Sequence, residues 1–295
     1  MLGSSRATHH LSMSVGFALL SLLFAGLLDV VFKWYARIDR SRGMYVLGIG
    51  VVWTALQCLI ILASGTTISI DGQMLAFGLT AGLLLSVANL CLIESLTHVD
   101  VSLASTIYRL NTIGVVALAV ILLGEPLTPV KATGVVIGLA AVMVLYERGR
   151  GAPHQRRVAL YFWLAVLAAI LRACFGIVTK AAALRGVDLQ LLLLLNGPVW
   201  ILVGGVYAIF RERGLRVTAA KVKYSLVSGS LACGVVNFLM LALALGEASV
   251  VVPIANMSFL VALLISTGQR MERFTSRKLV VVALTVTAIV VLANA

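Results

Sequence analysis

Arg109 is the side chain in this sequence best suited to bind an anion inside an apolar segment. It lies in the apolar stretch 101–122. Hydroxyl side chains recur around it at steps of three and four residues: Ser102, Ser105, Thr106 and Thr112. Such steps place side chains on one helical face, and a guanidinium offers two parallel donors to a carboxylate or a phosphate. The stripe predicts an anion-binding face, although Arg109 could instead pair with Glu94 and only hold helices together.

Five further ionisable residues fall within apolar segments: Asp29, Lys33, Glu94, Arg172 and Lys180. Charged side chains are costly in lipid and usually serve a function there. The cations outnumber the carboxylates, which favours a substrate with a carboxylate or a phosphate, and an amino acid would also fit. Arg172 could instead form a buried ion pair, and the two lysines could reach the membrane interface. Asp29 and Glu94 are the candidate proton carriers.

Amides and indoles add further candidate contacts for a substrate. Four amides lie within apolar segments: Gln57, Asn89, Asn196 and Asn237. Asn89 and Asn237 are candidate binding residues, although hydrogen bonding between helices is the commoner role of such amides. Trp53 and Trp200 could line a cavity or fill the packing between helices.

The composition identifies the kind of chain that must position these residues. Hydrophobic residues make up 61% of the 295 positions and charged residues 12%, an apolar share far above that of a soluble domain. Ten stretches approach the roughly 20 residues that span a bilayer: 13–35, 44–64, 74–96, 101–122, 127–146, 158–183, 189–210, 223–245, 249–268 and 278–294. Backbone groups in lipid must be hydrogen-bonded within their own segment. We therefore predict an all-α integral membrane protein with ten transmembrane helices.

The sequence repeats at an offset of 147 residues. Trp53 aligns with Trp200, and Lys33 aligns with Lys180. Each repeat holds five predicted helices, so the second repeat must enter the membrane in the opposite sense to the first. We expect two inverted repeats, at 12–146 and 158–294, joined by a basic linker at 147–157.

The same offset aligns Arg109 with Asn256. Pro253 lies just before Asn256 and removes a backbone N–H, which frees a carbonyl one turn earlier. Irregular helices are where transporters bind their substrates. We expect Arg109 and Asn256 to face each other across a cavity between the repeats.

The net charge of +12 is distributed unevenly between the two sides of the predicted membrane domain. One set of alternate loops carries most of the Lys and Arg residues: Arg37, Arg40, Arg42, Arg148, Arg150, Arg156, Arg157, Arg211, Arg213, Arg216, Lys221, Lys223, Arg270, Arg273, Arg277 and Lys278. The opposite side carries Arg6, Lys131 and Arg185. Cationic loops stay in the cytoplasm, so both termini are expected in the periplasm. Contact with anionic lipids explains these charges without a nucleic-acid partner.

Two signatures recur at matching places in the repeats. Lys33 and Lys180 close the first helix of each repeat, and GEPLTP at 124–129 opens the fifth helix, followed by GVVIG at 134–138. The second repeat has MERFTS at 271–276, without the glycines. In these features the chain resembles the EamA-type branch of the drug/metabolite transporter superfamily. Many members are described with cytoplasmic termini, whereas the charges here place the termini outside.

The resemblance implies a ten-helix transporter that works by alternating access, as a monomer or as a homodimer through the fifth helix. Substrates across the superfamily include amino acids, sugars, nucleotide sugars, phosphorylated metabolites and drugs. We expect a multi-pass inner (plasma) membrane transporter of a small polar metabolite, with an exporter of drugs or amphipathic compounds as the alternative within the family.

Enzyme motifs are missing from the sequence. It has no HExxH, no clustered aspartates for magnesium, no glycine-rich phosphate loop and no serine elbow. The four cysteines fall within predicted helices and form no CxxC pair, which favours apolar filling. We expect no cofactor and no metal, and an integral membrane lipid-modifying enzyme is the less favoured alternative.

Overall fold

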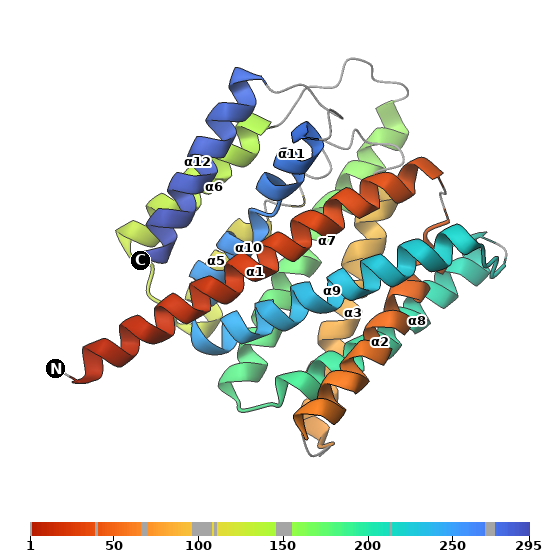
Figure 1. The fold of residues 1–295 in the computed structure, drawn as a ribbon, viewed down its shortest axis with the longest axis horizontal. Helices are drawn as coiled ribbons and strands as arrows, with labels where there is room; N and C mark the ends of the chain where they lie inside the picture. The colour runs from red at the N-terminus through yellow and green to blue at the C-terminus, as the bar shows by residue number, and fades with distance from the viewer. Residues whose placement is uncertain are drawn as a thin grey trace.

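The structure is a computed structural model that describes residues 2–38, 41–65, 70–95, 108, 111–145, 155–212, 214–268 and 275–295. Those residues fold into helices, with no strand among them (Figure 1). The helices of the first half are α1 (Leu2–Ile38), α2 (Gly43–Ser64), α3 (Gly72–Ser95), α5 (Asn111–Leu123) and α6 (Pro129–Leu145). Those of the second half are α7 (Gln155–Leu184), α8 (Leu189–Glu212), α9 (Ala219–Leu245), α10 (Ala248–Asn256), α11 (Phe259–Gly268) and α12 (Ser276–Ala293).

The predicted all-α membrane architecture is confirmed. Eight stretches of the described helices are long and apolar enough to cross a bilayer, and one of them, Ala248–Ile265, includes α10 and most of α11. Two shorter apolar helices, Asn111–Leu123 and Pro129–Val144, fall within the remaining two predicted segments. The chain is therefore a multi-pass membrane protein.

The ninth predicted segment is not one continuous helix. Its first part, α10, contains Pro253 and ends at Asn256, and α11 begins at Phe259. The Met257 N–H donates to the Ile254 carbonyl at 3.0 Å, a tighter turn than an α-helix makes. The irregularity that Pro253 predicts is present, whereas α8 runs through Pro198 without a break.

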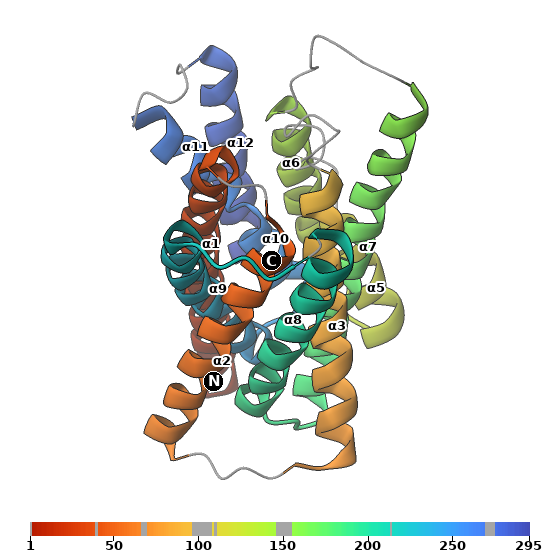
Figure 2. The same cartoon turned by 90° about the vertical axis from the view of Figure 1, so that its right-hand side faces the viewer.

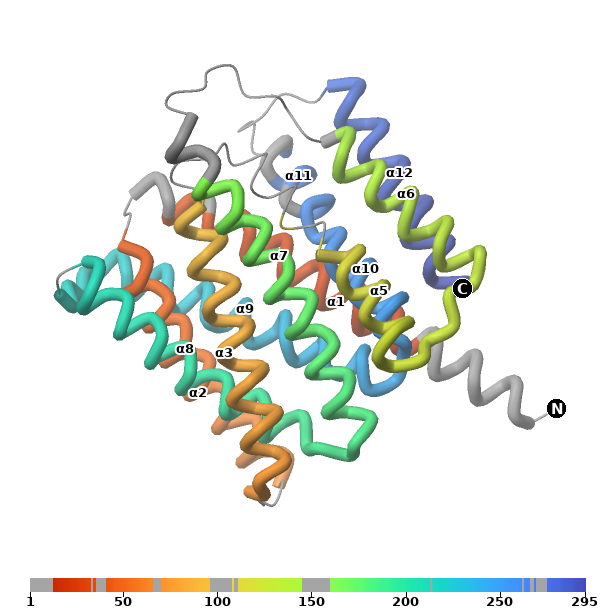
Figure 3. The backbone as a smooth tube through the Cα atoms, turned by 180° about the vertical axis from the view of Figure 1, so that it is seen from behind, coloured from red at the N-terminus to blue at the C-terminus, as the bar shows by residue number. Residues whose placement is uncertain are grey.

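The helices pair in a pattern that is consistent with inverted repeats. The offset of 147 residues relates α1 to α7 and α3 to α9. In the structure α1 packs on α9 and α3 packs on α7, while α2 packs on α8 and α6 on α12. Figure 2 shows α1, α2 and α9 on one side, α3, α7 and α8 on the other, and α10 between them. The same layers are visible from behind in Figure 3.

The tightest contact between the repeats joins α2 to α8 through glycines. A Cβ atom added at Gly197 would lie 2.1 Å from Thr54 Oγ1, and one added at Gly50 would lie 2.9 Å from the Ile201 nitrogen. Gly50 and Gly197 are equivalent positions in the two repeats. Because equivalent positions meet each other here, a pseudo-two-fold axis would pass between α2 and α8 at this level.

The glycines of the fifth predicted helix pack inside the chain. A Cβ atom at Gly134 would lie 2.6 Å from Leu292 Cγ of α12, and one at Gly138 would lie 2.5 Å from Met257 Cε. Small residues of this kind permit close helix contact. Gly134 and Gly138 of α6 therefore face α12 and Met257 within the chain, and a homodimer contact through this helix stays a prediction.

The connections between helices meet at two opposite ends, as alternating transmembrane segments require. At one end the Glu212 carboxylate accepts hydrogen bonds from Ser41 Oγ (2.7 Å) and the Gly43 nitrogen (2.9 Å). At the other end Lys131, which follows the α5–α6 connection, forms an ion pair with Glu247 in the α9–α10 connection. Among the described residues, the first end carries the basic residues Arg42, Arg211, Arg216 and Lys221.

This arrangement gives a testable orientation. We predict that the basic end faces the cytoplasm and that both termini face the periplasm, because cationic loops are retained inside. A reporter that is active only in the cytoplasm is expected to be silent when fused after Ala295. The same reporter fused after Arg150, in the basic linker, is expected to be active. A strong signal from the Ala295 fusion would reverse the assignment.

Candidate functional site

Three amides from three helices form a hydrogen-bonded cluster between the repeats. Gln57 Nε2 of α2 donates to Gln190 Oε1 of α8 at 2.6 Å. Asn237 Nδ2 of α9 donates to Gln57 Oε1 at 3.0 Å. The Gln57 side chain is fully buried. Asn237, a predicted binding residue, therefore lies at a contact between the first and second repeats.

One turn from Gln57, two tryptophans meet across the α2–α8 contact. The ring centroids of Trp53 and Trp200 are 5.6 Å apart, and their planes make an angle of 64°. Both indoles are buried, and the Nε1 atom of each has no hydrogen-bond partner among the described residues. An edge-to-face pair of this kind is a favourable packing arrangement. Packing of the rings does not supply a hydrogen-bond acceptor for either indole N–H group.

Asn196 adds two more unsatisfied polar atoms to α8. Its side chain is fully buried, and within the part of the chain that the structure describes neither Oδ1 nor Nδ2 has a hydrogen-bond partner. Asn196 lies one turn before Trp200 on the same helix. Leaving a buried polar group unpaired costs about 1–3 kcal/mol, so a group of them calls for an explanation such as a ligand or an ordered water.

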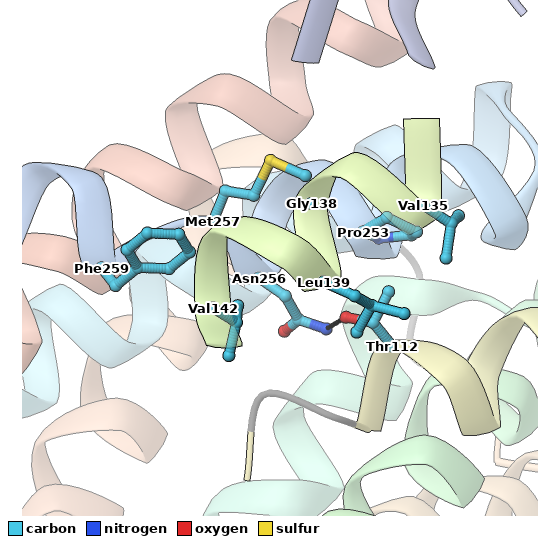
Figure 4. Close-up of a pocket in the computed structure, with 9 residues that line it drawn as sticks. All are labelled: Thr112, Val135, Gly138, Leu139, Val142, Pro253, Asn256, Met257 and Phe259. Carbon is cyan, nitrogen blue, oxygen red and sulfur yellow. Dashed lines mark hydrogen bonds between the residues drawn. The ribbon is translucent and has the colours of Figure 1, made fainter. Parts of the chain in front are cut away.

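A second polar cluster links α5 to α10. Asn256 Nδ2 donates to Asn111 Oδ1 at 2.6 Å and to Thr112 Oγ1 at 3.0 Å. A small pocket adjoins it, as Figure 4 shows, lined by Thr112, Val135, Gly138, Leu139, Val142, Pro253, Asn256, Met257 and Phe259. The helix after Arg109 therefore does meet the helix that carries Asn256. Arg109 itself lies outside the described residues.

Arg172 is half-buried on α7 among aromatic rings. Its guanidinium carbon lies 5.9 Å from the ring centroid of Tyr108 and 5.8 Å from that of Phe175. These distances are within the range of cation–π attraction. Tyr108 directly precedes Arg109 in the sequence. The structure therefore places Arg172 beside Tyr108, the described residue that precedes Arg109 in the sequence.

The GEPLTP segment holds two helices in place. Glu125 accepts hydrogen bonds from the Ala248 nitrogen (2.8 Å) and the Ser249 nitrogen (2.9 Å), at the start of α10. Thr128 Oγ1 accepts from the Lys131 nitrogen at 3.2 Å and caps α6. Oxygen atoms at helix N-termini satisfy backbone N–H groups that have no partner within the helix. The glutamate thus connects the first repeat to the second.

Comparison with known proteins identifies the family. Residues 12–147 match the sequence model of the EamA-like transporter family. The chain is thus similar to the EamA-like transporter family over its first repeat, as the sequence signatures predict. A solved structure described only as the crystal structure of a protein superposes with a TM-score of 0.80 and 14% identity, over 95% of this chain and 97% of that one. At that identity the likeness shows the fold alone. A search of curated proteins finds no match.

Members of the EamA-like family are membrane transporters. In this chain the Lys180 side chain forms hydrogen bonds to backbone carbonyl groups. Its Nζ atom donates to the Leu243 carbonyl at 2.7 Å and the Gly246 carbonyl at 2.6 Å. The side chain of its repeat partner, Lys33, lies outside the described residues. A role for these lysines in substrate binding stays a prediction. In the structure the Lys180 ammonium group is hydrogen-bonded to the backbone at the end of α9.

The two predicted proton carriers of this EamA-like transporter lie in different surroundings. Asp29 Oδ2 of α1 accepts a hydrogen bond from Ser258 Oγ, at the break between α10 and α11, at 3.4 Å. Glu94 forms an ion pair with Arg42 and accepts from the Tyr207 hydroxyl at 2.6 Å. This places Glu94 in a charged cluster at the basic end of the helices. Proton transport by either residue stays a prediction that uptake under an imposed pH gradient would test.

Asn89 of α3 makes a local hydrogen bond. Its Nδ2 atom donates to the Leu85 carbonyl of the same helix at 2.8 Å.

The structure brings three of the predicted binding residues together near Gln57: Trp53, Trp200 and Asn237. Asn256 lies in the second cluster. Asn196 lies within an apolar segment two residues before Pro198, and this is the signal in the sequence that points to it.

Proposed function

We propose that this EamA-like transporter moves a small polar metabolite with a carboxylate or a phosphate across the inner (plasma) membrane by alternating access. The substrate would bind between the repeats, beside the Trp53–Trp200 pair. The observation that carries this proposal is the set of buried polar atoms without partners on Trp53, Asn196 and Trp200. They lie next to amides that hydrogen-bond across the repeats.

The chemistry of those atoms supports an acceptor-rich substrate. An indole N–H can only donate a hydrogen bond, so each tryptophan needs an acceptor. Carboxylate and phosphate oxygens accept several hydrogen bonds at once. Arg172 would add positive charge near the anionic group of the substrate. The sequence predicts the same role for Arg109. In an amino acid, the Asp29 carboxylate is the candidate partner for the amine.

The indole donors provide the test of this proposal. Trp53→Phe and Trp200→Phe keep an aromatic ring but remove the N–H group. Each is expected to weaken substrate binding roughly tenfold, because one hydrogen bond to a charged oxygen is lost. The measurement is the thermal shift of purified variants with a panel of carboxylates, phosphates, amino acids and amphipathic cations.

Trp163→Phe is the matched control, because Trp163 of α7 is 64% exposed. It is expected to bind the panel as the wild type does. Equal affinity in all three variants would remove the indoles from the site. A wild type that responds only to amphipathic cations would instead favour the drug-exporter alternative.

A further inference from the structure

Charged side chains from both repeats hold the turn between α9 and α10. Lys180 donates to the Leu243 and Gly246 carbonyls at the end of α9, and Glu125 accepts from the first amides of α10. The C-terminal end of a helix carries partial negative charge and the N-terminal end partial positive charge. Each of the two side chains therefore has the sign that stabilises the helix end it binds.

An ion pair reinforces the same turn. Lys131 pairs with Glu247 and donates to the Pro126 carbonyl at 2.9 Å. The Lys131, Glu125 and Lys180 side chains are buried, at 3%, 8% and 8% exposure. Removing one partner from a buried charged contact leaves the other charge uncompensated. We call Glu125, Lys131, Lys180 and Glu247 the α10 latch.

The α10 latch, like Glu212 at the start of α2, differs from local helix caps in joining distant parts of the chain. Asp71 caps α3 by accepting from the Met74 nitrogen at 2.6 Å, three residues away. Asp188 caps α8 by accepting from the Gln190 nitrogen at 2.8 Å. Glu125 instead caps a helix 123 positions away, in the other repeat. Local residues suffice to cap a helix, so the long-range contact of Glu125 must be explained by what it connects.

The α10 latch connects one end of the molecule to the second polar cluster. It fixes the N-terminus of α10, which is nine residues long. At the other end of α10, Asn256 contacts Asn111 and Thr112 of α5. The helix ends directly afterwards, and α11 begins at Phe259. A short helix held at one end and broken at the other can move as a unit when the held end is released.

We infer that the α10 latch is a conformational device that keeps this end of the transporter closed. This inference rests on the proposed alternating access. When the repeats separate at this end, the contacts of Glu125 with α10 and of Lys131 with Glu247 must break, since both cross between repeats. Release would free α10, shift Asn256 relative to α5, and so couple opening to the binding region.

The direct test measures the distance between the repeats at this end. Spin labels are placed on cysteines at Leu127 and Leu184, which are 53% and 62% exposed and belong to different repeats, in a background without the four native cysteines. Glu125→Gln is expected to shift the ratio of open to closed distances roughly tenfold toward the open state, because the charge that binds the α10 amides is lost. Lys131→Gln should shift it in the same direction.

Asp71→Asn is the matched control, because it weakens a carboxylate cap that lies within one repeat. It should leave the distance distribution as in the wild type. The inference fails if folded Glu125→Gln and Lys131→Gln proteins both keep the wild-type distribution, or if Asp71→Asn shifts it equally.

Cross-linking gives a second readout that involves transport. A short bis-maleimide between Lys131→Cys and Glu247→Cys, in the same cysteine-free background, should abolish transport of the compound that gives the largest thermal shift. Each single-cysteine variant should keep, after treatment with the reagent, the transport rate that it has before treatment. Full activity after complete cross-linking would overturn the inference. A distance shift in a protein that binds no carboxylate or phosphate would leave the α10 latch standing and reject the proposed substrate class.

Discussion

Replacing Arg109 by alanine is expected to abolish transport, while the protein still folds. Arg109 lies three residues before Thr112, and the polar stripe of the sequence places both on one helical face. In the structure Thr112 accepts a hydrogen bond from Asn256 of the other repeat, so Thr112 meets α10. Arg172 lies beside Tyr108, the neighbour of Arg109. Two arginines would then approach the anionic group of the substrate.

The expected loss follows from the strength of a charged, two-pronged contact. Hydrogen bonds to charged groups contribute about 1.5–3 kcal/mol each, so Arg109→Ala should weaken binding by roughly tenfold to more than a hundredfold. Arg109→Lys keeps the charge but loses the fork, so its affinity should fall between the wild type and Arg109→Ala. Ligand affinity in folded variants, compared with Arg172→Ala, is the measurement. If Arg109→Ala binds as well as the wild type, Arg172 becomes the candidate anion-binding residue.

Gly204→Ala is expected to destabilise the protein markedly. A Cβ atom at Gly204 of α8 would lie 2.5 Å from the Leu47 nitrogen and 2.8 Å from the Gly43 carbonyl oxygen. Both are backbone atoms of α2, so the clash can be relieved only by separating the helices. Overpacking of this kind costs about 1–3 kcal/mol. The midpoint of thermal unfolding in detergent should fall clearly.

The adjacent glycine provides a matched control. A Cβ atom at Gly205 would lie 3.4 Å from Leu47 Cδ1, the end of a flexible side chain. Both substitutions gain roughly the same 1 kcal/mol of helix propensity, so the difference between them isolates the contact with α2. Gly205→Ala should unfold at or slightly above the wild-type temperature. Equal unfolding midpoints for the two variants would show that the α2 and α8 backbones leave room for a Cβ atom at Gly204.

The helices could be predicted from the sequence because lipid requires each spanning segment to satisfy its own backbone. Apolar length alone therefore located the segments that the described helices occupy. Pro253 is the one residue in this segment that predicts an irregular helix. The helix ends three residues after it, at Asn256, and the sequence does not predict that position. The start of α1 at Leu2, ahead of the predicted residue 13, has no apolar signal to announce it.

The site could be predicted in part. Trp53, Trp200 and Asn237 were selected because polar or aromatic groups in lipid need partners, and the structure brings them together. The partners of Lys180, Glu94 and Glu125 could not be predicted, because they lie far along the chain and include backbone atoms. The spacing of residues within one helix carries no information about such contacts.

Counterflow in proteoliposomes is the measurement that tests the central claim most directly. The compound that gives the largest thermal shift is supplied in labelled form outside vesicles loaded with the unlabelled compound. An alternating-access transporter with its site between the repeats should show saturable, transient accumulation, and Arg109→Ala should show none. Flux that does not saturate and is unaffected by the unlabelled compound inside would contradict the account, because it would indicate a channel without an alternately exposed site.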